Sequence, residues 1–163
     1  MADLYVGSNK VTGIKPPGSN TIIPLSGKKI RGINAVLSTT TLTSNQFSQS
    51  SDDGNRFPGV KTITLKEGTT QIPAGCFRNL SSLEYIIIPA SVTKIYSDSF
   101  AGCTSLTDIY FEGEPPSEGI GSTAFSGLTL TIHYHDSDVW QSIISSNSSE
   151  YSGAAASIAW EAY

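Results

Sequence analysis

Three stretches of the chain repeat one pattern of hydrophobic and polar positions. In the first of them, Ile63 and Leu65 alternate with Thr62 and Thr64. This period of two is typical of a β-strand with one buried face. The stretches are 60–65, 83–88 and 106–111, and each begins 23 residues after the one before. The pattern therefore predicts equivalent strands in three 23-residue repeats.

Hydrophobic positions downstream of each predicted strand also recur. The third repeat is two residues longer than the others, through an insertion at 114–117. A single repeat cannot bury its own apolar face, so neighbouring repeats must stack and share one core. We expect a mainly β protein built on a short leucine-rich-repeat-like solenoid of three repeats. The recurring columns are Ile72, Ile95 and Ile120, then Phe77, Phe100 and Phe125, then Leu80, Cys103 and Leu128.

The segment after the third repeat predicts a small C-terminal cap made of a helix and a strand. Residues 128–134 alternate apolar and polar residues, as a strand does. Residues 136–138 (DSD) then offer N-capping side chains to 139–144, whose apolar spacing suits one short amphipathic helix. The aromatic residues of 157–163 indicate a last strand docked on this cap.

The first third of the chain differs in kind from the repeats. Short apolar runs separated by Gly, Pro and Asn predict a small β-rich module over 1–37, with strands at 4–6, 11–14, 21–25 and 29–37. Residues 38–56 are rich in Ser and Thr, which indicates a linker or exposed loop. The expected domains are therefore 1–37, the linker 38–56, and a repeat domain with its cap over 57–163.

The repeats resemble the BspA-like leucine-rich repeats over about residues 60–135. The resemblance is carried by 72–77 (IPAGCF), 88–95 (IPASVTKI) and 99–106 (SFAGCTSL). The third repeat departs from the family pattern at Pro115 and Pro116, and we interpret it as a terminal one. The resemblance implies a leucine-rich-repeat fold and, as one function, adhesion to host matrix or to another cell.

Composition and charge narrow the possible partners. The chain is 38% hydrophobic and 15% charged, with a formal net charge of -4, which indicates a folded protein without a broad basic surface. We therefore expect no nucleic-acid partner and no binding to an anionic membrane. The first residues carry no signal-peptide pattern, and the longest aliphatic run, 86–88, is far too short to insert into a membrane. Because the chain has only two cysteines, we expect both thiols to be free.

No pattern of catalytic residues is present, so we expect a protein that is not an enzyme and that has no cofactor. The sequence lacks a phosphate-binding loop, a nucleophile elbow and a paired Cys-x-x-Cys motif. His133 and His135 lie two residues apart at a predicted strand end, and they resemble the His-x-His iron motif of some phage fibres. We favour two solvated imidazoles over a metal site there. Residues 52–55 (DDGN) are interpreted as a polar turn rather than a calcium loop.

The outward positions of the repeat strands are the candidate binding residues. Stacking places Thr62, Tyr85 and Asp108 in one outer column, and Thr64, Ile87 and Tyr110 in the next. Exposed aromatic rings beside an aliphatic side chain suit a contact with another protein. The alternative is that the N-terminal region or a neighbouring subunit covers this face. The predicted binding residues are Thr64, Tyr85, Ile87, Asp108 and Tyr110.

Residues 3–14 (DLYVGSNKVTGI) resemble the openings of bacteriophage virion proteins. The leading hypothesis is therefore a phage virion accessory protein, such as a head or tail fibre or a decoration protein. Its N-terminal module would attach to other virion proteins or trimerise, and its repeats would bind a host-surface protein or glycan. The alternatives are an adhesin at the bacterial cell surface and a soluble protein-interaction module. The attachment residues would be Leu4, Tyr5, Val6 and Ile14.

Overall fold

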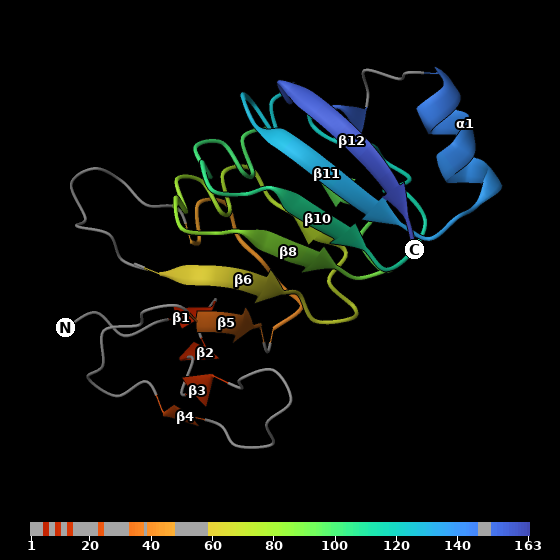
Figure 1. Cartoon of the computed structure of the whole chain (residues 1–163). Helices are drawn as coiled ribbons and strands as arrows, with labels where there is room; N and C mark the ends of the chain where they lie inside the picture. The colour runs from red at the N-terminus through yellow and green to blue at the C-terminus, as the bar shows by residue number, and fades with distance from the viewer. Residues whose placement is uncertain are drawn as a thin grey trace.

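A six-stranded parallel sheet dominates the computed structural model of the chain (Figure 1). The structure describes residues 5–6, 9–10, 13–14, 23–24, 33–37, 39–47, 59–146 and 151–163. The strand order is β12-β11-β10-β8-β6-β5. Its strands are β5 (Ile33–Val36), β6 (Val60–Thr64), β8 (Tyr85–Ile88), β10 (Asp108–Phe111), β11 (Thr129–Tyr134) and β12 (Ser157–Ala162). The predicted mainly β fold with repeated strands is confirmed, and the strands of this sheet run parallel.

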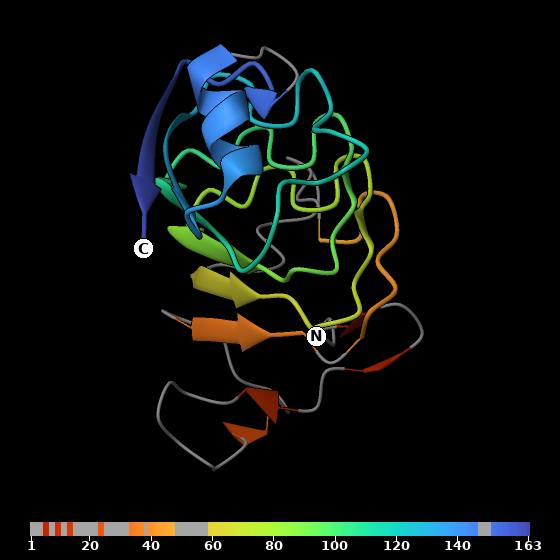
Figure 2. The ribbon, with the colours of Figure 1, turned by 90° about the vertical axis from the view of Figure 1, so that its right-hand side faces the viewer.

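The 23-residue interval sets the register of the central strands. Ile63 pairs with Ile86, and Ile86 pairs with Ile109, so that equivalent side chains stand side by side in the core. The chain then turns to a second, smaller sheet of β7 (Gln71–Ile72) and β9 (Lys94–Ile95), which Ile120 joins through a single bridge. Figure 2 shows the long sheet on one side of the molecule and the connecting turns on the other. The core lies between them.

A stack of phenylalanine rings runs through the turns opposite the long sheet. Phe77 and Phe100 lie 5.4 Å apart between ring centroids, and Phe100 and Phe125 lie 5.6 Å apart. All three side chains are fully buried. The stack continues to Phe47, 5.4 Å from Phe77, a residue that the sequence pattern did not place in this column.

Residues 33–47 extend the repeats at their N-terminal end. β5 pairs in parallel with β6, and the Phe47 amide donates a hydrogen bond to the Cys76 carbonyl at 2.8 Å. Leu42 and Phe47 are both buried in the shared core. The described residues 39–47 thus place two apolar side chains in the core, and the linker or exposed loop over 38–56 stays a prediction. The division of the chain into 1–37, 38–56 and 57–163 likewise stays a prediction.

The structure also extends the sheet at its C-terminal end. β11 pairs in parallel with β10 in the same register as the repeat strands, with Ile109 beside Ile132. β12 pairs in parallel with β11, so the last strand is a member of the sheet as well as a neighbour of the cap. The strand order thus continues the pattern beyond the three strands that the 23-residue interval predicts.

The predicted capping helix is present as α1 (Asp138–Ser146). The Trp140 amide donates a hydrogen bond to Ser137 Oγ at 3.3 Å, which is the N-cap geometry. The Trp140 side chain is buried, and its Nε1 donates to the Gly113 carbonyl at 3.0 Å, which fixes the helix to the third repeat. No helix in the described part of the chain is long and apolar enough to cross a membrane.

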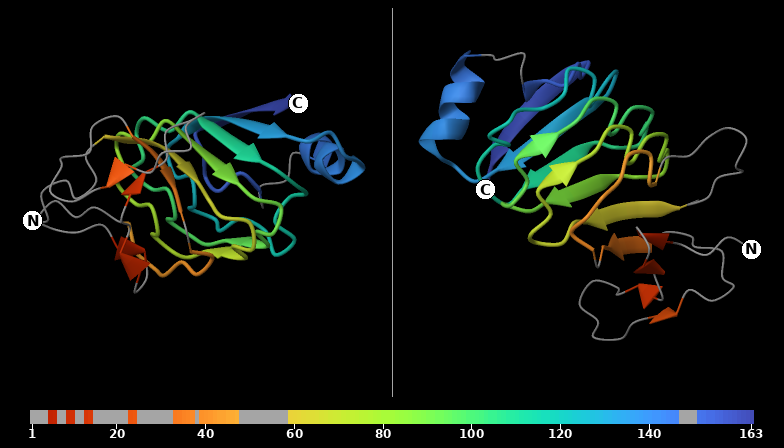
Figure 3. Two further views of the ribbon diagram at one scale, coloured as in Figure 1. Left: turned by 90° about the horizontal axis from the view of Figure 1, so that it is seen from below. Right: turned by 180° about the vertical axis from the view of Figure 1, so that it is seen from behind.

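The N-terminal strands form separate antiparallel pairs. β1 (Tyr5–Val6) pairs with β2 (Asn9–Lys10), and β3 (Gly13–Ile14) pairs with β4 (Ile23–Pro24). They lie at the β5 end of the long sheet, opposite the helix (Figure 3). Leu4 and the expected polar turn at 52–55 lie outside the described residues.

Candidate binding face

The outer face of the long sheet carries the predicted binding residues in two rows. One row runs through Thr62, Tyr85, Asp108 and Thr131, and the other through Thr64, Ile87, Tyr110, His133 and Glu161. The predicted columns are therefore correct in register. Thr62 is only 6% exposed, so it does not contribute to an accessible surface, contrary to its expected outward position. The other row is accessible along its length, from Val36 on β5, which pairs with Thr64 and is 51% exposed, to Glu161 on β12.

Aromatic rings from four strands or strand ends meet on this face. Tyr110 lies at the centre, stacked on the His133 imidazole with 4.1 Å between ring centroids and 4° between planes. Tyr85 meets Tyr110 edge to face at 5.8 Å. Tyr163, which follows β12, meets Tyr110 in the same way at 6.2 Å. We call Tyr85, Tyr110, His133 and Tyr163 the aromatic strip.

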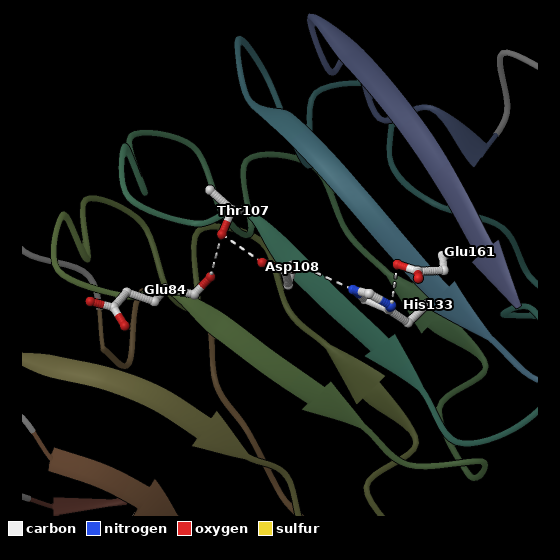
Figure 4. A network of polar contacts seen from close by, with 5 residues as sticks. All are labelled: Glu84, Thr107, Asp108, His133 and Glu161. Atoms are coloured by element: carbon white, nitrogen blue, oxygen red, sulfur yellow. Dashed lines mark hydrogen bonds and ion pairs between the residues drawn. The ribbon is translucent and has the colours of Figure 1, made fainter. Parts of the chain in front are cut away.

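His133 also joins three neighbouring strands through its ring nitrogens (Figure 4). Its Nε2 lies 2.7 Å from Asp108 Oδ1, and its Nδ1 lies 3.3 Å from Glu161 Oε2. Thr107 Oγ1 donates a second hydrogen bond to the Asp108 carboxylate, at 2.6 Å. A protonated imidazole can donate to both carboxylates, so this network links β10, β11 and β12 across the outer face.

The carboxylates of the network alter the acidity of their neighbours. Partial burial acts to raise the pKa of Asp108, but hydrogen bonds from His133 and Thr107 outweigh it and hold this pKa below its ordinary value. Burial raises the pKa of Tyr110, and the nearby Asp108 and Glu161 carboxylates raise it further. Burial and Glu112 likewise raise the pKa of Tyr163. The aromatic strip therefore lies in a region of negative potential.

The lowered pKa of Asp108 predicts a pH dependence of stability. An acid whose pKa is lower in the folded state stabilises the fold above its unfolded pKa, and this contribution is lost as pH falls through the folded pKa. We expect the free energy of unfolding to decrease as pH drops below 3.8, the ordinary value. In Asp108→Asn, the free energy of unfolding should decrease less over the same pH range. Urea unfolding followed at a series of pH values measures it, and identical pH slopes for both proteins would exclude this role of Asp108.

The geometry of the two histidines does not bring them together as a metal pair. Both ring nitrogens of His133 face carboxylate oxygens, whereas His135 lies beyond β11, exposed, with its ring 4.5 Å from that of Tyr163. Among the described residues, no group of three or more His, Cys, Asp or Glu side chains could hold a metal ion. His133 instead belongs to the aromatic strip.

The two cysteines lie in the core, away from the outer face. Cys76 and Cys103 are unpaired and fully buried. Burial raises the pKa of each thiol to about 12. Because the thiolate is the reactive form, neither group has the character of a nucleophile, and both act as small apolar side chains.

Sequence reasoning found part of this face and missed the rest. Tyr85, Ile87 and Tyr110 were predicted from the repeat interval. His133 lies 23 residues after Tyr110, so the same interval could have placed it in the strip. Tyr163 could not be placed in this way, because no equivalent spacing connects β12 to β11.

Comparison with known proteins gives one match. The family model described as the BspA type leucine-rich repeat region (6 copies) matches residues 29–151. The match begins before β5 and ends between α1 and β12, so it includes the N-terminal extension of the repeats and the capping helix but not the last strand. No curated protein and no solved structure matches the chain significantly.

Proposed function

The chain belongs to the BspA-type leucine-rich repeat family, and from this premise we propose that it is a non-enzymatic binding protein. Its stacked units form a short solenoid, in which each unit supplies one strand to a common binding face. The aromatic strip on that face contacts a protein on the surface of a cell. Proteins of this family are repeat proteins suited to protein or surface binding, which supports the general assignment.

The observation that carries this proposal is the exposure of aromatic rings on the outer face of the sheet. Tyr163 is 55% exposed, and Tyr85 and Tyr110 are partly exposed beside it. Aromatic side chains provide a large contact area at a small cost in conformational entropy, and they are enriched where binding energy concentrates. Exposed aromatic rings gathered on one face mark a contact surface, whereas rings scattered singly over a protein do not.

A pair of matched variants tests the proposal. Fluorescently labelled protein is mixed with a panel of intact bacterial and cultured epithelial cells, and binding is measured by flow cytometry. Tyr85→Ser removes a ring of the strip, whereas Tyr96→Ser removes a tyrosine that is 39% exposed next to β9, on the smaller sheet. We expect the first variant to lose at least about fivefold in binding and the second to retain it. Equal loss in both variants, or no binding to any cell type, would contradict the proposal.

The N-terminal module is proposed to attach the protein to a phage particle or to assemble it as a trimer. Support comes from the resemblance of residues 3–14 to virion proteins and from the antiparallel pairing of β1 to β4, which differs from the parallel repeats. Tyr5, Val6 and Ile14 lie on these strands. Many copies on one particle would strengthen a weak single contact. Family membership supports the alternative, an adhesin at the bacterial cell surface, and an interaction module without either location is the third candidate.

Light scattering on the intact protein separates these alternatives. A mass three times the 17.3 kDa of one chain is expected for the virion proposal. A monomer would contradict trimer assembly and would favour the adhesin or the interaction module.

A further inference from the structure

Carboxylates border the aromatic strip. Asp108 and Glu161 lie on the strip through their contacts with His133, and Glu112 is close enough to Tyr163 to raise its pKa. The Glu161 side chain is 65% exposed, so its charge remains available to a partner. At the β6 side of the face, Lys61 forms an ion pair with Glu84. The strip therefore offers negative charge together with aromatic rings.

The charge of the whole repeat region has the same sign. Eleven of the 14 acidic residues lie between 59 and 163, but only four of the 10 basic residues do. Two of these four are also engaged away from the strip, since Arg78 pairs with Asp98 and Lys94 donates to the Glu118 carbonyl. A partner that approaches this region thus meets a field that attracts cations and repels anions.

The rings and the neighbouring carboxylates together suit a cationic group. Stacking on a sugar requires an open ring face, but one face of Tyr110 is covered by the parallel His133 imidazole at 4.1 Å. A lysine or arginine side chain over the face of a tyrosine ring gains a cation–π contact, and it can also pair with a neighbouring carboxylate. Tyr85 and Tyr163 flank Tyr110 on either side and supply such positions.

We propose that the aromatic strip binds a lysine- or arginine-rich segment of its protein partner. The cation lies against the rings of Tyr85 or Tyr163 and pairs with Glu161 or Glu112. This inference rests on the proposed function of the same face and adds the chemistry of the partner. It also predicts that anionic glycans are not ligands of this face.

The test uses the full chain and a fluorescent peptide that alternates Lys with Gly. Binding is measured by fluorescence anisotropy at low and at physiological ionic strength, with a Glu and Gly peptide and heparin as anionic probes. We expect the Lys peptide to bind, with weaker affinity at higher salt, and the anionic probes not to bind. Binding of heparin or of the Glu peptide at a similar affinity would overturn the inference.

Matched variants localise the binding to the strip. Tyr85→Ser and Glu161→Gln should each weaken the affinity about two- to fivefold, as expected for one exposed cation contact. Tyr96→Ser and Glu118→Gln make the same chemical changes beside β9, where Thr93 Oγ1 donates a hydrogen bond to the Glu118 carboxylate at 2.9 Å. These controls should change the affinity less than about twofold. Equal weakening by strip and control variants would show unspecific attraction to an acidic protein and would overturn the inference.

The outcomes for the partner chemistry and for the proposed function are distinguishable. If Tyr85→Ser abolishes cell binding but the Lys peptide does not bind, the inference fails and the binding face remains. If the Lys peptide binds at the strip but Tyr85→Ser leaves cell binding unchanged, the site has cation-binding chemistry and the proposed cell-surface function fails.

Discussion

Phe100→Ala is expected to lower the free energy of unfolding by about 3–5 kcal/mol, the largest effect among the substitutions considered. The Phe100 ring is fully buried and stacks between Phe77 and Phe125, at 5.4 and 5.6 Å. Removing it leaves a cavity and breaks both ring contacts, so neighbouring units lose packing with each other. Urea unfolding followed by circular dichroism measures the change.

Two further variants make this prediction specific to the ring stack. Phe100→Leu should lose less stability than Phe100→Ala, because leucine refills much of the cavity. Tyr96→Ala changes an exposed ring of the same region and should shift the free energy of unfolding by no more than about 0.5 kcal/mol. A loss in Phe100→Ala no larger than that in Tyr96→Ala would contradict a continuous ring stack as the support of the fold.

The same column shows how far the fold could be predicted from the sequence. Phe77 and Phe100 recur at the repeat interval, and the structure confirms that they stack. Phe47 escaped detection because it lies 30 residues before Phe77, rather than 23. A search for repeats in the sequence detects only residues that recur at equal intervals. The hydrophobic core can include an apolar side chain at any interval, provided that the fold brings it into contact with the core. Longer connections between units therefore hide members of the repeat.

The candidate site was predictable to a similar degree. Strand alternation and the repeat interval place Tyr85 and Tyr110 side by side, and the structure confirms this arrangement. His133 was interpreted from the motif around it, although its position on β11 depends on the same interval. Its contact with Glu161 depends on β12, whose pairing follows a helix and connections of irregular length. The alternation of apolar and polar residues along a strand indicates on which face of the sheet a side chain lies. Only the register of the paired strands determines which side chain lies next to it.

Gly121→Ala is expected to lower the free energy of unfolding by about 3 kcal/mol, because the new methyl group would meet backbone atoms. A Cβ at this position would lie 2.3 Å from the Ser97 amide nitrogen and 2.6 Å from the Tyr96 carbonyl carbon. Rotation of a side chain cannot relieve this overlap. The Gly121 amide also donates to the Ile95 carbonyl at 2.7 Å, so the two units would have to separate at a hydrogen bond that joins them.

Gly127→Ala provides the matched control for this close approach. Gly127 has a φ of 75°, which disfavours alanine, but a Cβ there would have no atom within 4 Å. Gly127→Ala should therefore lower the free energy of unfolding by about 1 kcal/mol, the cost of placing alanine in this backbone conformation. Thermal and urea unfolding of both variants compare the two effects directly. The contrary outcome is that Gly127→Ala lowers the free energy of unfolding more than Gly121→Ala does. In that case the positive φ, and not the close approach of neighbouring units, would determine which residues these turns allow. If Gly121→Ala is the more destabilising, backbone contact between Gly121 and the Tyr96–Ser97 peptide fixes the spacing of these two units beside the smaller sheet.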